Sequence, residues 1–564
     1  MSSLPSASVT IQDAPNASAS GIDNVVIMAV VPSNADKTPR PFASTAALLD
    51  FHGYGDGVEL AAMHLAETGK PVIFCGLPTG TAGAVGSQDD SQVDGTCAIT
   101  VTGTPLAEAD LVLNVLTGGT IGTNGIVFEY SLDGGSSYKT VRLGTASSYA
   151  IPYSGLTLAF AAGTLLADDV FTCYASAPNW AAADLATARD ALAAQARGAR
   201  TFVLVGDCTT AQDASDFLTE VNGYETENDR FVEGRAQVRD RYRAANFSNV
   251  GTVTFATAGD TITRSAGSFI ADGFREGDIV VSGAVASGGA NNGTKTVLTV
   301  TATVLTCSTN LTDEGPLAAG SVHITQAAES IPTWLTAVEA TFASVDGEER
   351  LDLGRGRGRK LCPISGWHKR LPVTWAADCR EFQHDVQIPT YRKADGPCSG
   401  WDLEDEDGNT VEYDARIHGG ADAKFTCFRS YANGPGGAFI CLSLTRADED
   451  SLLSRTHNMH VVNVAQTVTQ KATENAIGQV LVLNSDGTGT EEALSVLEGR
   501  VNSALKIALL QPGLEGPRAS GAEWTASRTD VLNIPGAILT GTLALLLNGT
   551  LEHIQTAVKI QTAG

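Results

Sequence analysis

The sequence lacks an excess of basic residues and lacks any long, uninterrupted apolar run. It holds 37 Lys and Arg residues against 63 Asp and Glu residues, a formal net charge of −26. General nucleic-acid binding needs a basic surface that displaces counterions, so this charge argues against it. The longest apolar stretch near the C-terminus, 537–547, is interrupted by Thr540, Gly541 and Thr542 and is too short to span a bilayer. No basic segment followed by an apolar one opens the chain, so we expect synthesis in a cytoplasm, without a signal peptide or membrane insertion.

The cysteines form no C-x-x-C pair. Ten are scattered along the chain, which argues against zinc ribbons and thioredoxin-like redox chemistry. The ordinary role of such a cysteine is that of a buried, reduced thiol that packs as a small apolar side chain. Half of the ten fall between residues 362 and 441, and they could form disulfides within or between chains if the protein leaves the cell. These five are Cys362, Cys379, Cys398, Cys427 and Cys441.

Common catalytic motifs are also missing. There is no G-x-S-x-G elbow of the serine hydrolases. The run GRGRGRK at 354–360 is not a Walker A loop, because no Ser or Thr follows a Gly-Lys pair, and it is not a Rossmann fingerprint. Asp207 and Cys208 end a buried strand, where α/β enzymes place nucleophiles, but we interpret Cys208 as a structural thiol. The sequence therefore predicts no catalytic residue and no cofactor.

Two groups of metal-ligating residue types are weak candidates for a site. The acidic stretch 402–409 differs from a calcium loop because Gly408 falls one place late, so we interpret it as a hairpin turn. Five histidines lie in the irregular segment 351–460: His368, His384, His418, His457 and His460. Only His457 and His460 are close in sequence, so we predict no metal site.

The basic run at 354–360 is the most unusual local feature of this acidic chain. Its four cations are Arg355, Arg357, Arg359 and Lys360. We interpret them as a docking patch for an acidic surface, either on a partner or on another copy of the chain. The alternatives are a solvated basic loop and a contact with nucleic acid.

Two segments alternate buried strands with helices. In the first, apolar runs at 24–31 and 71–77 enclose helices predicted at 46–51 and 58–68. In the second, an alanine-rich helix precedes the apolar run at 201–207. Strand–helix–strand order at this spacing is typical of parallel crossover units, so we expect one sheet with flanking helices.

Between and after these segments, 93–177 and 244–327 show short alternating runs divided by turn signals and no convincing helix, which predicts two antiparallel β domains. Farther on, we predict strands at 459–468 and 479–483. A helix is expected at 491–510, where Thr490 is the N-cap and leucines repeat on one face.

Both ends of the chain have strand patterns. The C-terminal segment alternates Ile554, Thr556, Val558 and Ile560 with polar or small residues, and the N-terminal segment contains Val9, Thr10 and Ile11. We interpret both ends as arms that add strands to sheets in neighbouring copies. The alternative is that each end pairs with its own domain.

These patterns predict an α+β multidomain chain: an α/β core of a sheet with flanking helices, two inserted antiparallel β domains, and strand arms at both termini. The expected segments are an N-terminal arm at 1–20, α/β segments at 21–92 and 178–243, inserted β domains at 93–177 and 244–327, a C-terminal core α/β domain at 328–548 and a C-terminal arm at 549–564.

This order of elements resembles that of the contractile-tail sheath proteins of myovirus-type bacteriophages. The resemblance is carried by the opening SVTIQDA, the strand NVVIMAVV, the segment STAALLDFHGYGDG and the following VELAAMHLAETGKPVIFCGL. The stretches VFEYSLDGGSSYKTVRL and FIADGFREGDIVVSG resemble β modules of phage structural proteins. The chain departs from the family in its many cysteines and in lacking a Pro-Gly-Val-Tyr opening, which leaves the register of the N-terminal arm open.

The resemblance implies a structural, non-enzymatic protein. Its arms would weave subunits into a helical sleeve of stacked rings around a tail tube, and the sleeve would contract without nucleotide to drive the tube into a host. The implied partners are further copies, the tail tube protein, and baseplate and neck or terminator proteins, in the virion tail after assembly in the host cytoplasm. Residues 21–92 would belong to the sheath middle domain. Two alternatives stay open: another virion or secretion-machine component, such as a baseplate or neck protein, and an α/β enzyme decorated with β modules.

Overall fold

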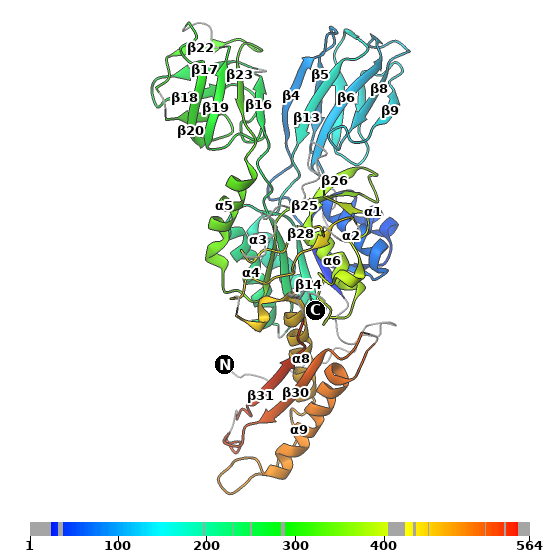
Figure 1. The fold of residues 1–564 in the computed structure, drawn as a ribbon, viewed down its shortest axis with the longest axis vertical. Coiled ribbons are helices and arrows are strands. Elements are labelled where there is room, and N and C mark those ends of the chain that lie inside the picture. Colours follow the sequence, from blue (N-terminus) through cyan, green and yellow to red (C-terminus); the bar gives the residue numbers. More distant parts are fainter. Residues whose placement is uncertain are drawn as a thin grey trace, which may run out of the picture.

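The computed structural model describes residues 24–31, 38–195, 198–228, 230–248, 251–283, 288–308, 310–403, 423–431, 436–448, 450–513, 515–534 and 537–550. Within these ranges the chain has a mixed α/β fold. Figure 1 shows an elongated molecule with two β domains side by side at one end, an α/β core in the middle and a helical unit with a β-hairpin at the other end. None of the described helices combines the length and apolar character needed to cross a membrane.

A six-stranded sheet forms the core, in the order β2-β3-β1-β14-β15-β24. All neighbours pair in parallel except β2 and β3. Taken in chain order, the five parallel strands have the 2-1-3-4-5 arrangement of a doubly wound fold, which reverses direction between β1 and β14. The strands are β1 (Val25–Val30), β2 (Arg40–Phe42), β3 (Val72–Leu77), β14 (Thr201–Cys208), β15 (Glu233–Val238) and β24 (Leu351–Gly354).

Helices cover both faces of this sheet, which explains why its strands are continuously apolar. One face packs against α1 (Thr45–His52), α2 (Asp56–Thr68) and α6 (Val373–Gln383). The other packs against α3 (Ala182–Ala194), α4 (Ala211–Thr226) and α5 (Ile331–Phe342). A side chain at Gly57 would lie 2.1 Å from the Ala29 side chain, so glycine is what lets α2 approach β1 this closely. The helices and strands expected at 24–31, 46–51, 58–68, 71–77 and 201–207 are confirmed.

The first β domain follows β3. Its five-stranded sheet has the order β4-β13-β6-β8-β9 and its three-stranded sheet the order β10-β11-β5, and residues of both sheets share one apolar core. β4 begins before the expected boundary at residue 93; its sequence, VGSQDDSQ, has no apolar alternation, and its pairing with β13 defines it. The strands are β4 (Val85–Gln92), β5 (Ile99–Gly103), β6 (Ala109–Thr117), β7 (Gly119–Thr120), β8 (Val127–Ser131), β9 (Lys139–Arg142), β10 (Ser148–Ala150), β11 (Leu156–Phe160), β12 (Thr164–Leu165) and β13 (Val170–Ala175).

The second β domain follows β15 and is one eight-stranded sheet in the order β16-β23-β19-β20-β21-β18-β17-β22. Its core contains Phe247, Phe255 and Phe269, all fully buried. The strands are β16 (Ala245–Ser248), β17 (Val253–Ala256), β18 (Thr261–Arg264), β19 (Gly277–Ser282), β20 (Gly293–Val300), β21 (Val304–Cys307), β22 (Glu314–Leu317) and β23 (His323–Gln326).

Short strands complete the core, and the C-terminal unit consists of α8, α9, β30 and β31. The short strands are β25 (Arg357–Leu361), β26 (His368–Pro372), β27 (Trp401–Asp402), β28 (Phe428–Arg429) and β29 (Phe439–Ile440). In the C-terminal unit, α8 (Thr456–Glu474) packs against α9 (Glu491–Leu505), which continues into a π-helical turn (Lys506–Leu510), and β30 (Ala519–Ala526) pairs with β31 (Gly541–Leu547).

Two predictions in this unit are wrong. Residues 459–468 form part of α8 and not a strand, because Val461, Val464 and Ala465 lie on one helical face that packs in the core with α9. Residues 479–483 form no strand; Leu483 makes one isolated bridge to Gly489. The helix expected at 491–510 is confirmed.

Candidate functional site

The predicted strand arms lie outside the described residues. This applies to Val9, Thr10 and Ile11 at the N-terminus and to Ile554, Thr556, Val558 and Ile560 at the C-terminus. Their exchange between copies stays a prediction. The surface that could receive such strands is described, and it is the β30–β31 hairpin.

The outer edge of β30 is already occupied by side chains of α9. The N–H of Trp524 donates to Asn502 Oδ1 (2.7 Å), and Asn502 Nδ2 donates to the Trp524 carbonyl (3.0 Å). The N–H of Ala526 donates to Glu498 Oε1 (2.8 Å). These backbone groups point away from β31, so α9 closes this edge of the hairpin.

The outer edge of β31 has no strand partner among the described residues. Trp524 lies opposite Leu543, and Ala522 lies opposite Leu545. Residues directly opposite in an antiparallel pair turn their backbone groups the same way, so those of Leu543 and Leu545 point away from β30. Within the described ranges no strand pairs with this edge. Figure 1 shows β31 on the side of β30 that faces away from α9.

The two faces of β31 differ. Leu543, Leu545 and Leu547 pack on the core of the C-terminal unit, whereas Leu546 on the opposite face is 63% exposed. A strand added to β31 would therefore continue an apolar face directed at α8 and α9.

The basic run at 354–360 does not form an exposed patch, so its interpretation as a docking surface is corrected. Arg355 is 3% exposed, with its guanidinium 4.8 Å from the centroid of the Phe425 ring. Arg357 Nη2 lies 2.7 Å from Asp207 Oδ2, and Lys360 Nζ lies 2.6 Å from Glu67 Oε1. Arg359 is half-buried in the cleft described next. The acidic partners of Arg357 and Lys360 belong to the same chain.

A cleft of about 750 Å³ lies where the two β domains join the core, at the carboxyl ends of β3 and β14. This is the edge at which doubly wound enzymes bind ligands. Here most of its charged side chains pair with one another or with the neighbouring Asp240, and we call this set the cleft network. Its pairs are Arg357 with Asp207, Asp240 and Glu108 (2.7, 3.4 and 3.7 Å), Arg370 with Asp240 (3.3 Å), Lys369 with Asp56 (3.5 Å), and Arg243 with Glu108 (3.4 Å) and Asp110.

The cleft network ties separate parts of the chain together. Asp207 lies on β14 and Arg357 on β25, and Glu108 lies immediately before β6 in the first β domain. Asp240 and Arg243 lie in the segment that leads to the second β domain. Burial raises the pKa of Asp207 to about 6, although Arg357 lowers it. Burial opposes the ionisation of Glu108, but Arg357 and Arg243 outweigh it and lower its pKa. The network is a junction between domains.

Cys208, at the end of β14, has no features of a nucleophile. Its side chain is fully buried, and burial raises the pKa of its thiol well above the ordinary value. A reactive cysteine needs an accessible, stabilised thiolate. The neighbouring Asp207 is held by Arg357. Among the described residues, no group of three or more His, Cys, Asp or Glu side chains could hold a metal ion.

Replacing Arg357 by Gln is expected to loosen the junction. Asp207, Asp240 and Glu108 would lose their shared cation, at a cost of about 1–3 kcal/mol in the free energy of unfolding. Trypsin should then cleave the segment 239–243 several-fold faster than in the unaltered protein. Arg142→Gln, an exposed site on β9, is the control; equal cleavage rates for the two variants would contradict a role in holding the domains.

The raised pKa of Asp207 predicts a pH effect. Between the ordinary pKa of an aspartate and about 6, the folded chain holds a proton that the unfolded chain has lost. The stability that this bound proton contributes is fully present below the ordinary aspartate pKa, and it is lost as the pH rises through about 6. Asp207→Asn, which cannot ionise, should therefore gain stability relative to the unaltered protein as the pH rises from the ordinary aspartate pKa through about 6, and the difference should level off above that, measured by urea unfolding. A difference that stays constant with pH would contradict this.

A second buried cluster, the joint cluster, attaches α8 to the core. It consists of Arg235, Glu233, Asp352, Glu381 and His460, each at most 4% exposed. Arg235 Nε lies 2.8 Å from Asp352 Oδ2, and Arg235 Nη2 lies 2.6 Å from Glu381 Oε2. His460 Nε2, on α8, lies 3.1 Å from Glu381 Oε1 and 3.3 Å from Glu233 Oε2. Burial lowers the pKa of His460 and raises that of Glu233, which favours the neutral form of both.

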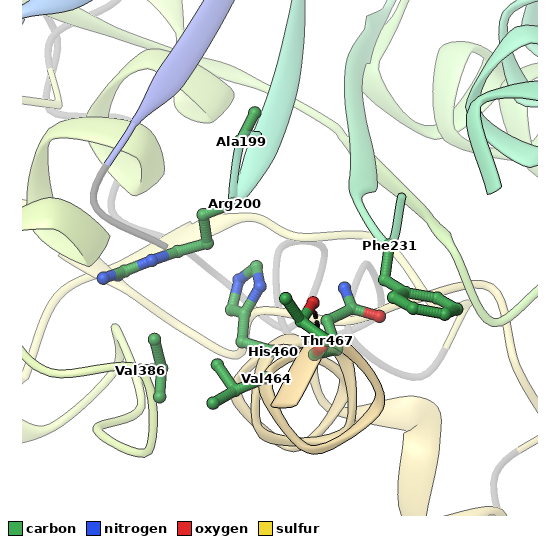
Figure 2. Close-up of a pocket in the computed structure, with 8 residues that line it drawn as sticks. Ala199, Arg200, Phe231, Val386, His460, Val464 and Thr467 are labelled. Carbon is green, nitrogen blue, oxygen red and sulfur yellow. Dashed lines mark hydrogen bonds between the residues drawn. The ribbon is translucent and has the colours of Figure 1, made fainter. Parts of the chain in front are cut away.

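Figure 2 shows a small cavity beside this cluster, lined from α8 by His460, Val464 and Thr467. Its volume is about 20 Å³, enough for about one water molecule. His457, one turn before His460, instead packs edge-on against the Tyr391 ring at 6.0 Å. The two closely spaced histidines therefore have separate structural contacts.

All ten cysteines are buried, and none is joined in a disulfide. The disulfides considered among Cys362, Cys379, Cys398, Cys427 and Cys441 stay a prediction.

Sequence comparisons match this chain to no protein-family model and to no curated protein. The structure is similar to a sheath tail protein from Desulfitobacterium hafniense, with 11% identity and a TM-score of 0.39 over 96% of this chain and 100% of that one. It is similar to a sheath tail protein from Listeria innocua, with 9% identity and a TM-score of 0.39 over 94% and 96% of the two chains. A third match is the sheath complex of an extracellular contractile injection system in its contracted state, with 10% identity and a TM-score of 0.30 over 40% of this chain and 60% of that one.

Proposed function

We propose that the chain is a structural subunit of a contractile tail sheath of a bacteriophage, and that it polymerises into a helical sleeve around a tail tube by exchanging β-strands between copies. The observation that carries the proposal is the outer edge of β31, which no strand of the described ranges pairs with, beside a β30 edge that α9 has closed. The resemblance drawn from the sequence favours the same role.

Strand addition to β31 suits the physical chemistry of the hairpin. An isolated two-stranded sheet is only marginally stable, and an unpaired edge is a template for another chain. The arm predicted at 549–564 alternates with a period of two, and its Ile554, Val558 and Ile560 would face the same way. They would extend the apolar face that Leu543 and Leu545 present to the core of the C-terminal unit. Matching of apolar faces fixes the register of such an added strand.

The remaining geometry suits a subunit that moves as a rigid body. The cleft network fastens the first β domain and the segment that leads to the second β domain to the core, and the joint cluster fastens the C-terminal unit. Contraction would then re-pack whole subunits while exchanged strands keep them connected, with no nucleotide required. The proposed partners are further copies, the tail tube protein, and baseplate and neck proteins. No catalytic step is assigned, because most charged groups of the cleft are paired and Cys208 is buried.

Negative-stain electron microscopy of the purified chain tests this proposal, beside a variant that lacks residues 1–20 and 549–564. We expect hollow tubes or stacked rings from the full chain, formed alone or on added tube protein, and single particles from the trimmed chain. Equal melting temperatures would show that the trimmed chain is folded. Tubes from both chains would contradict the role of the arms. Single particles from both in the presence of tube protein would favour a baseplate or neck component.

A further inference from the structure

Two of the ten cysteines lie directly opposite each other in a β-ladder. β28 and β29 pair antiparallel, with Phe428 opposite Ile440 and Arg429 opposite Phe439. The next pair in this register is Cys427 and Cys441, and the N–H of Cys441 donates to the carbonyl of Cys427 (2.7 Å). The cysteines are therefore cross-strand neighbours, although 14 positions separate them in the sequence.

The register also brings both thiols to one side of the ladder. Side chains of directly opposite residues project from the same face, and successive residues alternate between faces. Phe428 and Ile440 enter the core beside Trp401, whose ring centroid lies 5.4 Å from that of Phe428. Cys427 and Cys441 project from the other face. Directly bonded opposite residues have Cα atoms about 5.5 Å apart, within the range of about 4.4–6.8 Å that a disulfide spans.

A buried cation lies beside this pair. The Arg355 side chain interacts electrostatically with Cys427. The backbone N–H of Arg355 donates to the carbonyl of Thr426, the residue before Cys427 (2.8 Å). Within the described ranges Arg355 forms no ion pair with a carboxylate, and its Nη1 has no hydrogen-bond partner. A neighbouring guanidinium stabilises a thiolate, which is the reactive form of cysteine.

We propose that Cys427 and Cys441 are a disulfide site, closed by thiol–disulfide exchange when the protein meets a small disulfide such as oxidised glutathione. Cys441, at 7% exposed the more accessible of the two, attacks one sulfur of oxidised glutathione, and one glutathione thiolate leaves. The Cys427 thiolate beside Arg355 then attacks the Cys441 sulfur of the mixed disulfide and releases the second glutathione. Two protein thiols are oxidised, one glutathione disulfide is reduced to two thiols, and the two protons pass to the glutathione thiolates.

The new bond would tie the two ends of segment 427–441 together. It would hold Phe428 and Ile440 in the core and reduce the freedom of the unfolded chain. The reduced protein would fold in a cytoplasm, and the bond would form after the protein reaches an oxidising environment. This inference depends on the β28–β29 register and holds whichever assembly the chain belongs to.

Peptide mapping of the full chain tests the site. The folded protein is incubated with oxidised glutathione, the remaining thiols are alkylated under denaturing conditions, and the protein is digested with trypsin. Cleavage after Lys424, Arg429 and Arg446 gives peptides 425–429 and 430–446, each with one of the two cysteines. We expect these peptides to be recovered as one disulfide-linked species, while Cys362, Cys379 and Cys398 are recovered alkylated.

Two variants distinguish a specific Cys427–Cys441 disulfide from non-specific oxidation of the other cysteines. Cys441→Ser should abolish the linked species and the accompanying rise in melting temperature, whereas Cys398→Ser, at another buried site, should retain both. Recovery of Cys427 and Cys441 as alkylated thiols after oxidation would overturn the proposal. Linkage of either cysteine to a different partner would also overturn it.

Discussion

Replacing Leu545 by Pro is expected to abolish polymer formation while the monomer stays folded. Its N–H points away from β30, so no hydrogen bond between β30 and β31 is lost. Proline removes that donor and is tolerated on edge strands, where it blocks the addition of another strand. Electron microscopy and sedimentation should show particles of monomer size under conditions in which the unaltered chain forms tubes.

Leu545→Ala is the matched control for this substitution. It removes the same apolar side chain from the core of the C-terminal unit but keeps the backbone N–H. We expect it to polymerise, with stability lowered by about 1–2 kcal/mol for the half-buried leucine. Tubes formed by Leu545→Pro at the rate of the Ala variant would show that strand addition uses a different edge.

Replacing Arg235 by Leu is expected to lower the free energy of unfolding by about 3–5 kcal/mol. The guanidinium is completely buried and lies between Asp352 and Glu381. Without it, carboxylates of the joint cluster stay buried and lose their cation, which is the costly way to break a buried ion pair. Urea unfolding followed by circular dichroism measures the loss.

The pH dependence of this loss checks its cause. Burial opposes the ionisation of Glu381, but the adjacent Arg235 outweighs burial and holds the pKa of Glu381 well below the ordinary value. Its contribution to stability is therefore present above the ordinary glutamate pKa and is lost as the pH falls. The penalty of Arg235→Leu should shrink at acid pH, where the carboxylates can be protonated. Arg528→Leu, which breaks pairs with Glu491 and Glu498 at the surface, should cost much less. Equal losses for the two variants at all pH values would contradict this account.

The sequence predicted the elements whose pattern is local. Continuous apolar runs predicted β1, β3 and β14, and an amphipathic pattern that begins at an N-cap residue predicted α9. The strand expected at 459–468 is a helix, because packing against α9 outweighed the β-branched composition of the segment. β4 was missed because its polar sequence has no alternation, and pairing with β13 defines it.

The candidate site was harder to predict than the fold, because it is built from contacts between residues distant in sequence. The basic run was interpreted as a surface patch because its partners cannot be found locally: Asp207 is 150 positions from Arg357, and Glu67 is 293 positions from Lys360. The pattern of the arms was visible in the sequence, but the edge that could receive them was not. That edge is identified by Asn502 and Glu498 of α9, which occupy the β30 side of the hairpin, whereas no strand of the described ranges pairs with the β31 side.

The most direct test of strand exchange is a cryo-electron microscopy map of the assembled chain at a resolution that traces backbone. The account predicts a strand from another copy hydrogen-bonded to the outer edge of β31, with its apolar residues facing α8 and α9. A map in which copies assemble while that edge of β31 stays unpaired would contradict it.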